Sequence, residues 1–427
     1  MACVRQASGF RKYGADLPGE GWWECLASES ILSSIEFQMS LLLFVALAGY
    51  LVASRINQSA VVGEILVGIL VGPSVLGLIT YTDFVSSLAH LGAIFLLFTI
   101  GFEFCIRDIL NVRYGVIATI GVVAPWIGGY LTTSLLGYST ASALFVGTAL
   151  TATSIAITAN VLRELGRLET PVAKAIIGAA VIDDVLALLV LGVTTDMIRG
   201  SISISALGTS LAAAVVFIGL GLLAGIKIVS PLLAWLDCRP LARQYPEFVF
   251  MTALAVAFLY AMVAELIGLS AIVGAFIAGV SCREVTLCHS KDLREGAEYL
   301  QVIFAAIFFV SLGIIVDLHA ITPAVAVLVG VLTVVAMITK VVGCGLPARL
   351  FGYSWRDAAV IGFGMAPRGE VAMIVALIGL NAGVVGQEIF VAVIMMSLIT
   401  TVITPVVFQN WLLKPLPEEV APVCRQG

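Results

Sequence analysis

The chain is poor in charged residues. Asp, Glu, Lys and Arg make up only 11% of its 427 residues, whereas about a quarter is usual in a soluble domain. Hydrophobic residues make up 60% of the chain, and the mean hydropathy is +1.10. This composition excludes a disordered chain and an ordinary soluble enzyme. The class that remains is an all-α protein embedded in a membrane, with the lipid bilayer as its surroundings.

The chain also lacks the features of a zinc or nucleic-acid-binding protein. Its eight cysteines include no CxxC pair, and it has only three histidines, so we expect no structural zinc site. The formal net charge of −5 provides no basic excess for a nucleic-acid partner. We therefore interpret the cysteines as packing residues and expect no cofactor.

Thirteen apolar segments are candidate membrane spans, each of which needs about 20 mainly apolar residues. We expect them at residues 36–53, 60–79, 87–105, 114–136, 140–162, 171–196, 204–233, 247–265, 268–282, 298–316, 321–348, 357–380 and 388–413. They form one membrane domain over residues 36–413, followed by a tail of residues 414–427. Residues 1–35 contain no apolar signal region. They are interpreted either as an interfacial segment anchored by Trp22 and Trp23 or as a disordered extension.

Lysine and arginine are distributed unevenly between the two sets of predicted loops. One set, with the C-terminal tail, carries sixteen of these residues, and the other, with the N-terminal tail, carries four. Basic residues accumulate on the cytoplasmic side of membrane proteins. We therefore predict a multi-pass protein of the plasma (inner) membrane with its N-terminus outside and its C-terminus in the cytoplasm.

Several acidic residues lie near the ends of predicted spans, where a carboxylate can reach water. These are Glu64, Glu103, Asp196 and Glu265, and we interpret them as solvated rim residues. An alternative for Glu64 and Glu103 is that they line a funnel leading into the membrane.

Asp183 and Asp184 lie at the centre of the predicted span 171–196, and Lys340 lies inside another span. An ionisable residue within a span is costly and indicates a functional site. Adjacent helical residues point about 100° apart, so the two aspartates cannot face the same partner. We expect one to face a water-filled cavity and the other to face a cation such as Lys340.

Two further spans are polar at mid-depth. Arg368 and Glu370 lie in the predicted span 357–380, where they either neutralise each other and bind broken-helix backbone or take part in transport. Thr153 and Ser154 belong to a polar run in the span 140–162. Their hydroxyls either bind the preceding helical turn or line a site.

These features recur in two groups of three spans, the fourth to sixth and the eleventh to thirteenth. The four spans between the groups invert the second group relative to the first. The middle span of each group is interrupted, by the Thr/Ser run in one and by Gly364, Pro367 and Gly369 in the other. Interrupted helices at corresponding positions of inverted repeats indicate a transport site near the middle of the membrane.

With these residues the chain resembles the NapA-like sodium/proton antiporters of the cation:proton antiporter-2 family. The resemblance extends over about residues 36–413. It is carried by NQSAVVGEILVGILVGPSVLG, GAIFLLFTIGFE, GTALTATSIAITANVLRELG, GAAVIDDVLALLVLG, IVGAFIAG and GMAPRGEVAMIVALIGL. The aspartate pair combined with a distant intramembrane lysine is its specific part.

The resemblance implies a role for each candidate residue. Asp184 would be the carboxylate that binds Na⁺ and carries protons, and Asp183 would pair with Lys340. Thr153 and Ser154 would lie beside the ion. Arg368 and Glu370 would lie at the crossing of the twelfth span as charge-compensating residues.

The resemblance also implies an architecture. It predicts a core domain formed by about residues 114–196 and 321–413, with the remaining helices forming a dimerisation scaffold. A homodimer that works by elevator-like alternating access would be expected. The Asp-Asp pair, and a chain that ends soon after the last span, favour export of Na⁺ or Li⁺ over the alternative, potassium/proton exchange.

The surplus of titratable groups inside the spans predicts an electrogenic exchange, in which two protons enter for each sodium ion that leaves. Two other classes of protein are disfavoured. An intramembrane aspartyl protease needs two aspartates that meet at one point, whereas adjacent aspartates diverge. A channel does not require inverted, interrupted repeats.

Overall fold

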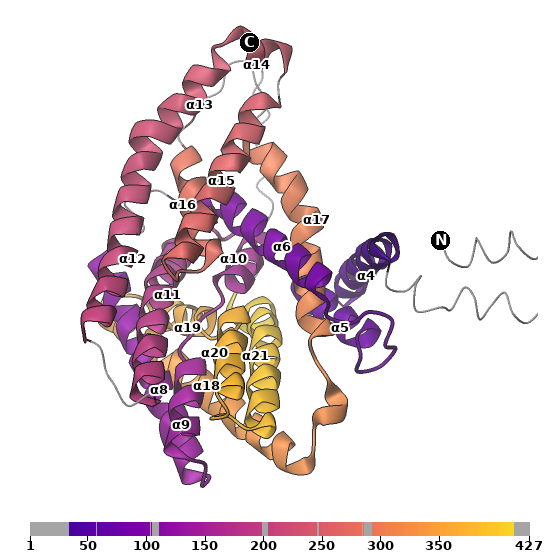
Figure 1. Cartoon of the computed structure of the whole chain (residues 1–427), viewed down its shortest axis with the longest axis vertical. Coiled ribbons are helices and arrows are strands. Elements are labelled where there is room, and N and C mark those ends of the chain that lie inside the picture. Colours follow the sequence, from indigo (N-terminus) through magenta and orange to yellow (C-terminus); the bar gives the residue numbers. More distant parts are fainter. Residues whose placement is uncertain are drawn as a thin grey trace, which may run out of the picture.

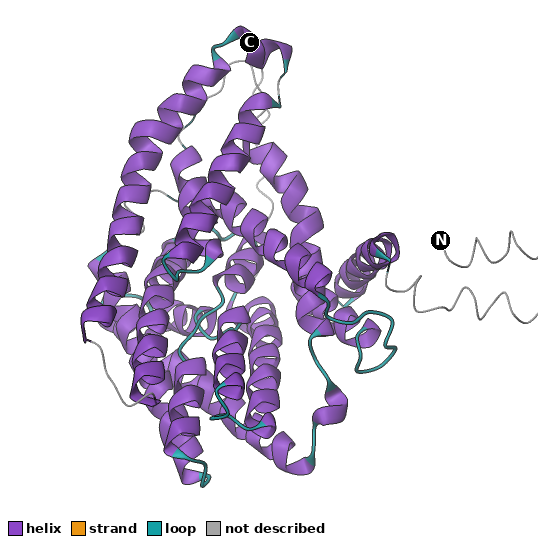
Figure 2. Ribbon diagram, viewed as in Figure 1, coloured by secondary structure: helices purple, strands orange, loops and turns teal. Residues whose placement is uncertain are grey.

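The structure is a computed structural model that describes residues 34–56, 58–102, 104, 111–198, 204–245, 247–283, 285 and 293–413. Regular structure in these ranges is entirely helical (Figures 1 and 2). The two predicted tails lie outside the described residues, except for residues 34 and 35. Glu103 and the side chain of Glu370 also lie outside the described part.

Nine segments of the described chain are long and apolar enough to cross a membrane. Seven are single helices: α4 (Ile35–Arg55), α6 (Asp83–Gly101), α8 (Val112–Leu135), α11 (Pro171–Ile198), α15 (Phe248–Leu266), α17 (Leu293–Ile314) and α18 (Pro323–Leu350). The other two contain a short π-helix: α12 (Ile204–Ala224) with η1 (Gly225–Val229) and α13 (Ser230–Asp237), and α21 (Gln387–Val407) with η3 (Phe408–Leu412).

Shorter helices account for the other predicted spans. They are α5 (Ala60–Val71), α9 (Thr140–Ala149), α10 (Ile155–Glu164), α16 (Ala271–Cys282), α19 (Trp355–Gly364) and α20 (Glu370–Asn381), while α14 (Pro240–Gln244) and the 3-10 turn η2 (Leu318–Ala320) lie between spans. The pairs α9–α10 and α19–α20 occupy the two spans that were predicted to be interrupted. Each of the thirteen predicted spans therefore corresponds to a single helix, to a helix that contains a short π-helix, or to one pair of half-helices.

One predicted span is much shorter than expected. The helix expected over residues 60–79 ends at Val71, and the chain then turns at Gly72 and Pro73. Proline has no N–H group and disfavours a helical residue before it. The apolar residues beyond Pro73 therefore belong to a loop, which contains Gly77 with a φ of +61°.

The two half-helix pairs are held between longer helices. Helix α18 packs along α8, α19 and α21, and α11 packs against α8. Figure 1 shows α20 beside α21 and α9 at the lower end of the molecule. Helices α16 and α17 both pack on α6. Helix α16 approaches α6 so closely that a Cβ atom on Gly279 would lie 2.1 Å from the carbonyl oxygen of Phe98. Small residues allow such close packing of helices in membranes.

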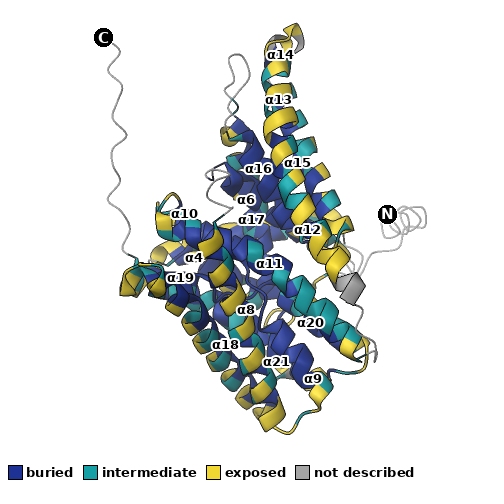
Figure 3. Cartoon of the chain, turned by 90° about the vertical axis from the view of Figure 1, so that its left-hand side faces the viewer, coloured by how far each residue is buried: buried dark blue, intermediate teal, exposed yellow. Residues whose placement is uncertain are grey.

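The outer surface of the helices is strongly apolar. Large side chains such as Phe44, Leu135 and Leu350 are 69%, 86% and 85% exposed. Figure 3 shows exposed residues along α8, α12 and α13, whereas α11, α16 and α21 are largely buried. A soluble protein rarely exposes apolar surface of this extent, whereas lipid tails cover it without penalty.

Candidate functional site

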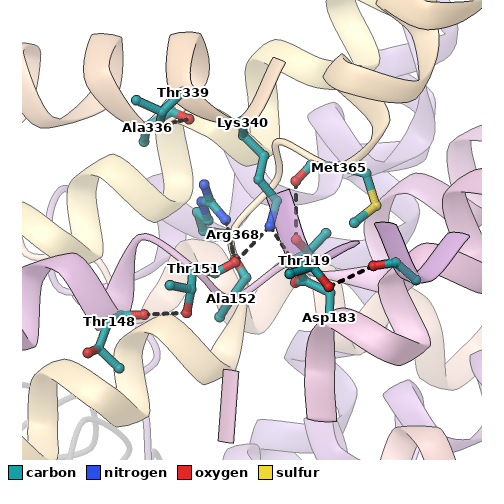
Figure 4. A network of polar contacts seen from close by, with 12 residues as sticks. Thr119, Thr148, Thr151, Ala152, Asp183, Ala336, Thr339, Lys340, Met365 and Arg368 are labelled. Carbon is teal, nitrogen blue, oxygen red and sulfur yellow. Dashed lines mark hydrogen bonds and ion pairs between the residues drawn. The ribbon is translucent and has the colours of Figure 1, made fainter. Parts of the chain in front are cut away.

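The two interrupted helices meet at their breaks. The backbone is non-helical between α9 and α10, at Thr151–Ser154, and between α19 and α20, at Ala366–Gly369. The Ser154 amide donates a hydrogen bond to the Pro367 carbonyl, at 2.9 Å, and Thr153 Oγ1 donates one to the Met365 carbonyl, at 3.2 Å. The two breaks are therefore bonded directly to each other, and Figure 4 shows Met365 of one break close to Thr151 and Ala152 of the other.

The local sequence explains why the two chains can approach so closely. Pro367 cannot continue a helical hydrogen-bond ladder. A Cβ atom on Gly369 would lie 2.7 Å from Ser154 Oγ, so only glycine fits there without displacement. The C-terminal ends of α9 and α19 and the N-terminal ends of α10 and α20 meet at this point. Helix C-termini carry partial negative charge and N-termini partial positive charge, so the crossing presents charge of both signs.

Lys340 forms the central ion pair of the site. Its Nζ atom lies 2.8 Å from Asp183 Oδ1 and 2.8 Å from the Thr151 carbonyl oxygen, and both side chains are fully buried (Figure 4). The residues come from α18 and α11, 157 positions apart in the chain. Asp183 Oδ2 has no hydrogen-bond partner among the described residues. The structure thus shows the pairing that the resemblance implies, while the roles of the two residues in transport stay predictions.

Arg368 binds broken-helix backbone. Its Nη1 atom donates to the carbonyl oxygens of Thr151, at 3.1 Å, and Ala152, at 2.5 Å. These carbonyls follow the C-terminal end of α9, which carries partial negative charge. The guanidinium is fully buried, and its Nε and Nη2 atoms have no partner within the described structure. The expected neutralising contact with Glu370 involves a side chain that lies outside the described part.

Asp184 faces a different helix from Asp183. Its side chain is 9% exposed, and its Oδ2 atom accepts a hydrogen bond of 3.4 Å from the backbone N–H of Ser270, the N-cap residue of α16. The positive end of that helix dipole points toward the carboxylate. The expected divergence of the two aspartates is therefore observed.

The polar run contributes three hydroxyl groups to the crossing, and one of them binds its own helix. Thr151 Oγ1 does bond the preceding turn, at the Thr148 carbonyl, whereas Thr153 bonds the opposite break. Ser154 Oγ is buried and has no hydrogen-bond partner among the described residues. An unpaired buried hydroxyl is costly. It fits an oxygen ligand for a hard monovalent cation, which would be transported substrate and not a resident metal.

Sequence reasoning missed several residues at the site. Thr158 Oγ1 donates to the Gly364 carbonyl at 2.6 Å, and Thr401 Oγ1 donates to the Arg368 carbonyl at 2.7 Å. Both threonines satisfy carbonyls freed by the α19–α20 break. Ser270 carried a recognisable signal, a serine directly before an apolar helix, which is typical of an N-cap. Nothing in the sequence indicated that this helix start lies against Asp184.

The rim interpretation of the acidic residues was wrong for Glu64. Glu265 is exposed and Asp196 is partly exposed, as expected, whereas Glu64 is only 6% exposed. Helices α4 and α17 both pack on α5, and a Cβ atom on Gly49 of α4 would lie only 2.6 Å from the Cα atom of Glu64, so the neighbouring helices cover this residue.

Comparison with known proteins identifies the family of the chain. A family model described as "Sodium/hydrogen exchanger, transmembrane" matches residues 41–414. The Na⁺/H⁺-K⁺ antiporter GerN of Bacillus cereus is 35% identical over 373 residues, which cover 86% of this chain and 94% of GerN. The high-affinity Na⁺/H⁺ antiporter NhaS3 of Synechocystis is 31% identical, with 92% of this chain and 94% of NhaS3 covered.

The fold also has a solved counterpart. The sodium proton antiporter MjNhaP1 of Methanocaldococcus jannaschii superposes with a TM-score of 0.67 at 18% identity, over 88% of this chain and 95% of that one. This likeness confirms the predicted all-α, multi-span antiporter fold. The family match extends over nearly the whole described membrane domain. The chain therefore belongs to the sodium/hydrogen exchanger family of transmembrane cation/proton antiporters, and it is a transporter and not an enzyme.

Proposed function

We propose that this protein exports Na⁺, or Li⁺, in exchange for H⁺, and that Asp184 is the carboxylate that carries either the cation or a proton. The observation that carries the proposal is the buried Asp183–Lys340 ion pair beside Asp184, at the point where the two broken helices cross. Thr153 and Ser154 lie at the same break and supply oxygen atoms next to the proposed path of the ion.

Exchange follows from the cost of a buried charge. A bare carboxylate in a low-dielectric site is unfavourable, and either a proton or a dehydrated cation removes this cost by neutralising the charge. A proton and Na⁺ compete for the same Asp184 oxygens, so the site releases one when it takes the other. The two ion gradients are then sufficient to drive transport, and no bound cofactor is needed.

Lys340 makes the exchange electrogenic in this proposal, with two protons entering for each Na⁺ that leaves. The carboxylates Asp183 and Asp184 and the cations Lys340 and Arg368 balance formally in the empty site. When Na⁺ binds Asp184, Lys340 releases a proton, since burial disfavours its charged form. The Asp183–Lys340 pair breaks and re-forms with the cycle. A buried ion pair is weak support for stability, so a switching role accounts for it better.

Further features of the proposal rest on the resemblance to NapA-like members of the cation:proton antiporter-2 family and on the distribution of basic residues. The core helices, about residues 114–196 and 321–413, would move against the remaining helices by an elevator-like motion. The protein would work as a homodimer in the plasma membrane. Its N-terminus would lie outside and its C-terminus in the cytoplasm, as the excess of lysine and arginine predicts.

A potassium/proton antiporter is the alternative. GerN, whose name includes both Na⁺ and K⁺, is a relative with 35% identity. Selectivity between these ions depends on the number of oxygen ligands and on cavity size. The Asp-Asp pair favours Na⁺ through the resemblance described above.

Purified protein in proteoliposomes tests the function. A pH gradient is imposed and its collapse is followed by a fluorescent dye while Na⁺, Li⁺ or K⁺ is added. Na⁺ and Li⁺ are expected to dissipate the gradient at concentrations where K⁺ does not. Dissipation by K⁺ alone would replace the proposal by its alternative, and no cation-dependent proton movement would reject antiport of these ions.

A further inference from the structure

A polar pocket that the proposed exchange does not use lies at the C-terminal end of half-helix α10. Its volume is about 400 Å³, it opens to the surface, and it is lined mainly by residues of α4, α5, α10 and α17. Its charged lining residues are Glu64, Glu164 and Arg163, and its polar lining includes Asn160 and Gln301. At about 30 Å³ per water molecule, the volume holds roughly a dozen waters, so a hydrated ion fits.

Glu64 is the residue of the pocket that requires a ligand. Its side chain is 94% buried and lines the cavity. No hydrogen bond or ion pair joins its carboxylate to any residue that the structure describes. Gln301 is fully buried in the same wall, and its Nε2 atom also has no partner within the described ranges. Buried polar groups left without partners are costly. Water in the pocket would satisfy both groups, and a hydrated cation would bind the carboxylate while its water accepts from the Gln301 amide.

The charge of the pocket selects a cation. Glu64 and Glu164 face the same cavity and repel each other electrostatically. Arg163 is engaged by the side-chain oxygens of Gln301 and Asn160, and Asn160 Nδ2 also bonds the Glu164 carboxylate at 2.9 Å. With both carboxylates ionised, they and the one guanidinium carry a net charge of −1, which one monovalent cation balances.

The position of the pocket places it on the approach to the crossing. Helix α10 begins directly after Ser154 and ends at Glu164, so its ten residues span about 15 Å. Glu164 is exposed at the mouth of the pocket, and Glu64 is buried farther in. The pocket therefore offers one exposed and one buried carboxylate at the far end of α10 from the crossing, on the face that carries the basic loops.

We propose that this pocket, between α10 and helices α4, α5 and α17, is a second cation site. It holds a hydrated monovalent cation at Glu64 and Glu164 before the cation loses its water and passes to the crossing. The inference rests on the proposed exchange for its physiological meaning, but it concerns a site separate from Asp184. It predicts that substitution of Glu64 affects cation capture from one face of the membrane only.

Sided transport assays test the second site. Everted vesicles expose the basic-loop face to added Na⁺, and right-side-out vesicles expose the opposite face. Glu64→Gln is expected to raise the KM for Na⁺ about five-fold in everted vesicles, because a negatively lined cleft concentrates cations. Vmax should change little, and the KM in right-side-out vesicles should match the parent. The difference should shrink as impermeant choline salt is raised, since salt screens charge.

Two further variants complete the test. Glu164→Gln removes the exposed carboxylate at the mouth, where loss of the fold is not expected, and should raise the same KM by a smaller factor. Glu298→Gln is the matched control: it removes an exposed carboxylate from α17 whose surface ion pair with Arg294 contributes little, and it should leave the KM unchanged. An unchanged KM in Glu64→Gln, or equal changes from both faces, would overturn the second site. A parent protein that shows no exchange would instead reject the proposed function.

Discussion

At the scale of single residues, neighbouring aspartates on one helix have different surroundings. Asp183 is fully buried and bound to Lys340, whereas Asp184 is slightly exposed and accepts a hydrogen bond from the start of α16. A residue already bound to a fixed cation is poorly placed to bind a second one. Asp184 is therefore the better candidate for the ion and proton carrier.

Asp184→Asn is expected to abolish exchange and leave the fold intact. Asparagine has the same volume but can neither hold a charge nor release a proton. The measurement is Na⁺-dependent dissipation of a pH gradient in proteoliposomes, together with the melting temperature of the purified variant. A variant that exchanges Na⁺ for H⁺ at the parental rate would show that another group carries the ions.

Lys340→Gln is expected to diminish the transport current or to make the exchange electroneutral, because it removes one titrating group from the site. Solid-supported-membrane recordings check this: a sodium jump should evoke a transient charge movement in the parent and much less in the variant. If the parent exchanges the ions without any current, the two-proton stoichiometry is wrong.

Stability provides the control for that variant. Removing Lys340 alone leaves Asp183 buried without its partner, and breaking a buried pair costs about 3–5 kcal/mol of folding free energy. The double variant Asp183→Asn/Lys340→Gln should melt closer to the parent than Lys340→Gln does. If Lys340→Gln loses transport only because it unfolds, the more stable double variant should recover transport.

At the scale of elements, the breaks in the two half-helix pairs form the framework of the site. The freed carbonyls and amides are satisfied across the crossing, by Ser154 with Pro367 and by Arg368 with Thr151 and Ala152. Non-helical backbone is tolerated at membrane depth only where it is buried in protein or lines a cavity. The two breaks therefore depend on each other.

Gly369→Ala is expected to reduce exchange by about ten- to a hundred-fold, since displacements of roughly 1 Å can have effects of this size at a reaction site. The added Cβ atom would lie 2.7 Å from Ser154 Oγ and 2.8 Å from Ser154 Cβ, so the two breaks must move apart. Gly386→Ala is the control, since nothing lies within 4 Å of its added Cβ atom. Equal exchange rates in the two variants would show that the close approach is not needed.

At the scale of the whole molecule, helices of uneven length enclose the site. Nine described segments are long enough to span a membrane, and the shorter helices, among them α5, α9, α16 and α20, lie among them. Exposed apolar side chains cover the outer surface, and the polar groups gather at the crossing and in the pocket beside α10. Lipid outside and hydrated polar groups inside are what a membrane transporter requires.

The orientation of the whole molecule is testable with a fusion at its C-terminus. Thirteen spans and sixteen basic residues on one side predict that Gly427 lies in the cytoplasm. A green fluorescent protein fused after Gly427 should fluoresce, and alkaline phosphatase fused at the same position should be inactive. An active phosphatase would mean that the membrane orientation is reversed.

The sequence alone determined the class of protein and its all-helical, multi-span fold, and it pointed to the residues that meet at the crossing. It could do so because a bilayer penalises charge and free backbone so strongly that Asp183, Asp184, Lys340 and the glycine–proline break stand out from their apolar surroundings. Only the tertiary structure decided which partner each residue meets. Helical periodicity indicates the face on which a side chain lies, but not which distant helix covers that face. The Ser270 amide at Asp184 and the pocket around Glu64 are formed by such contacts between distant helices, so they became visible only in the folded chain.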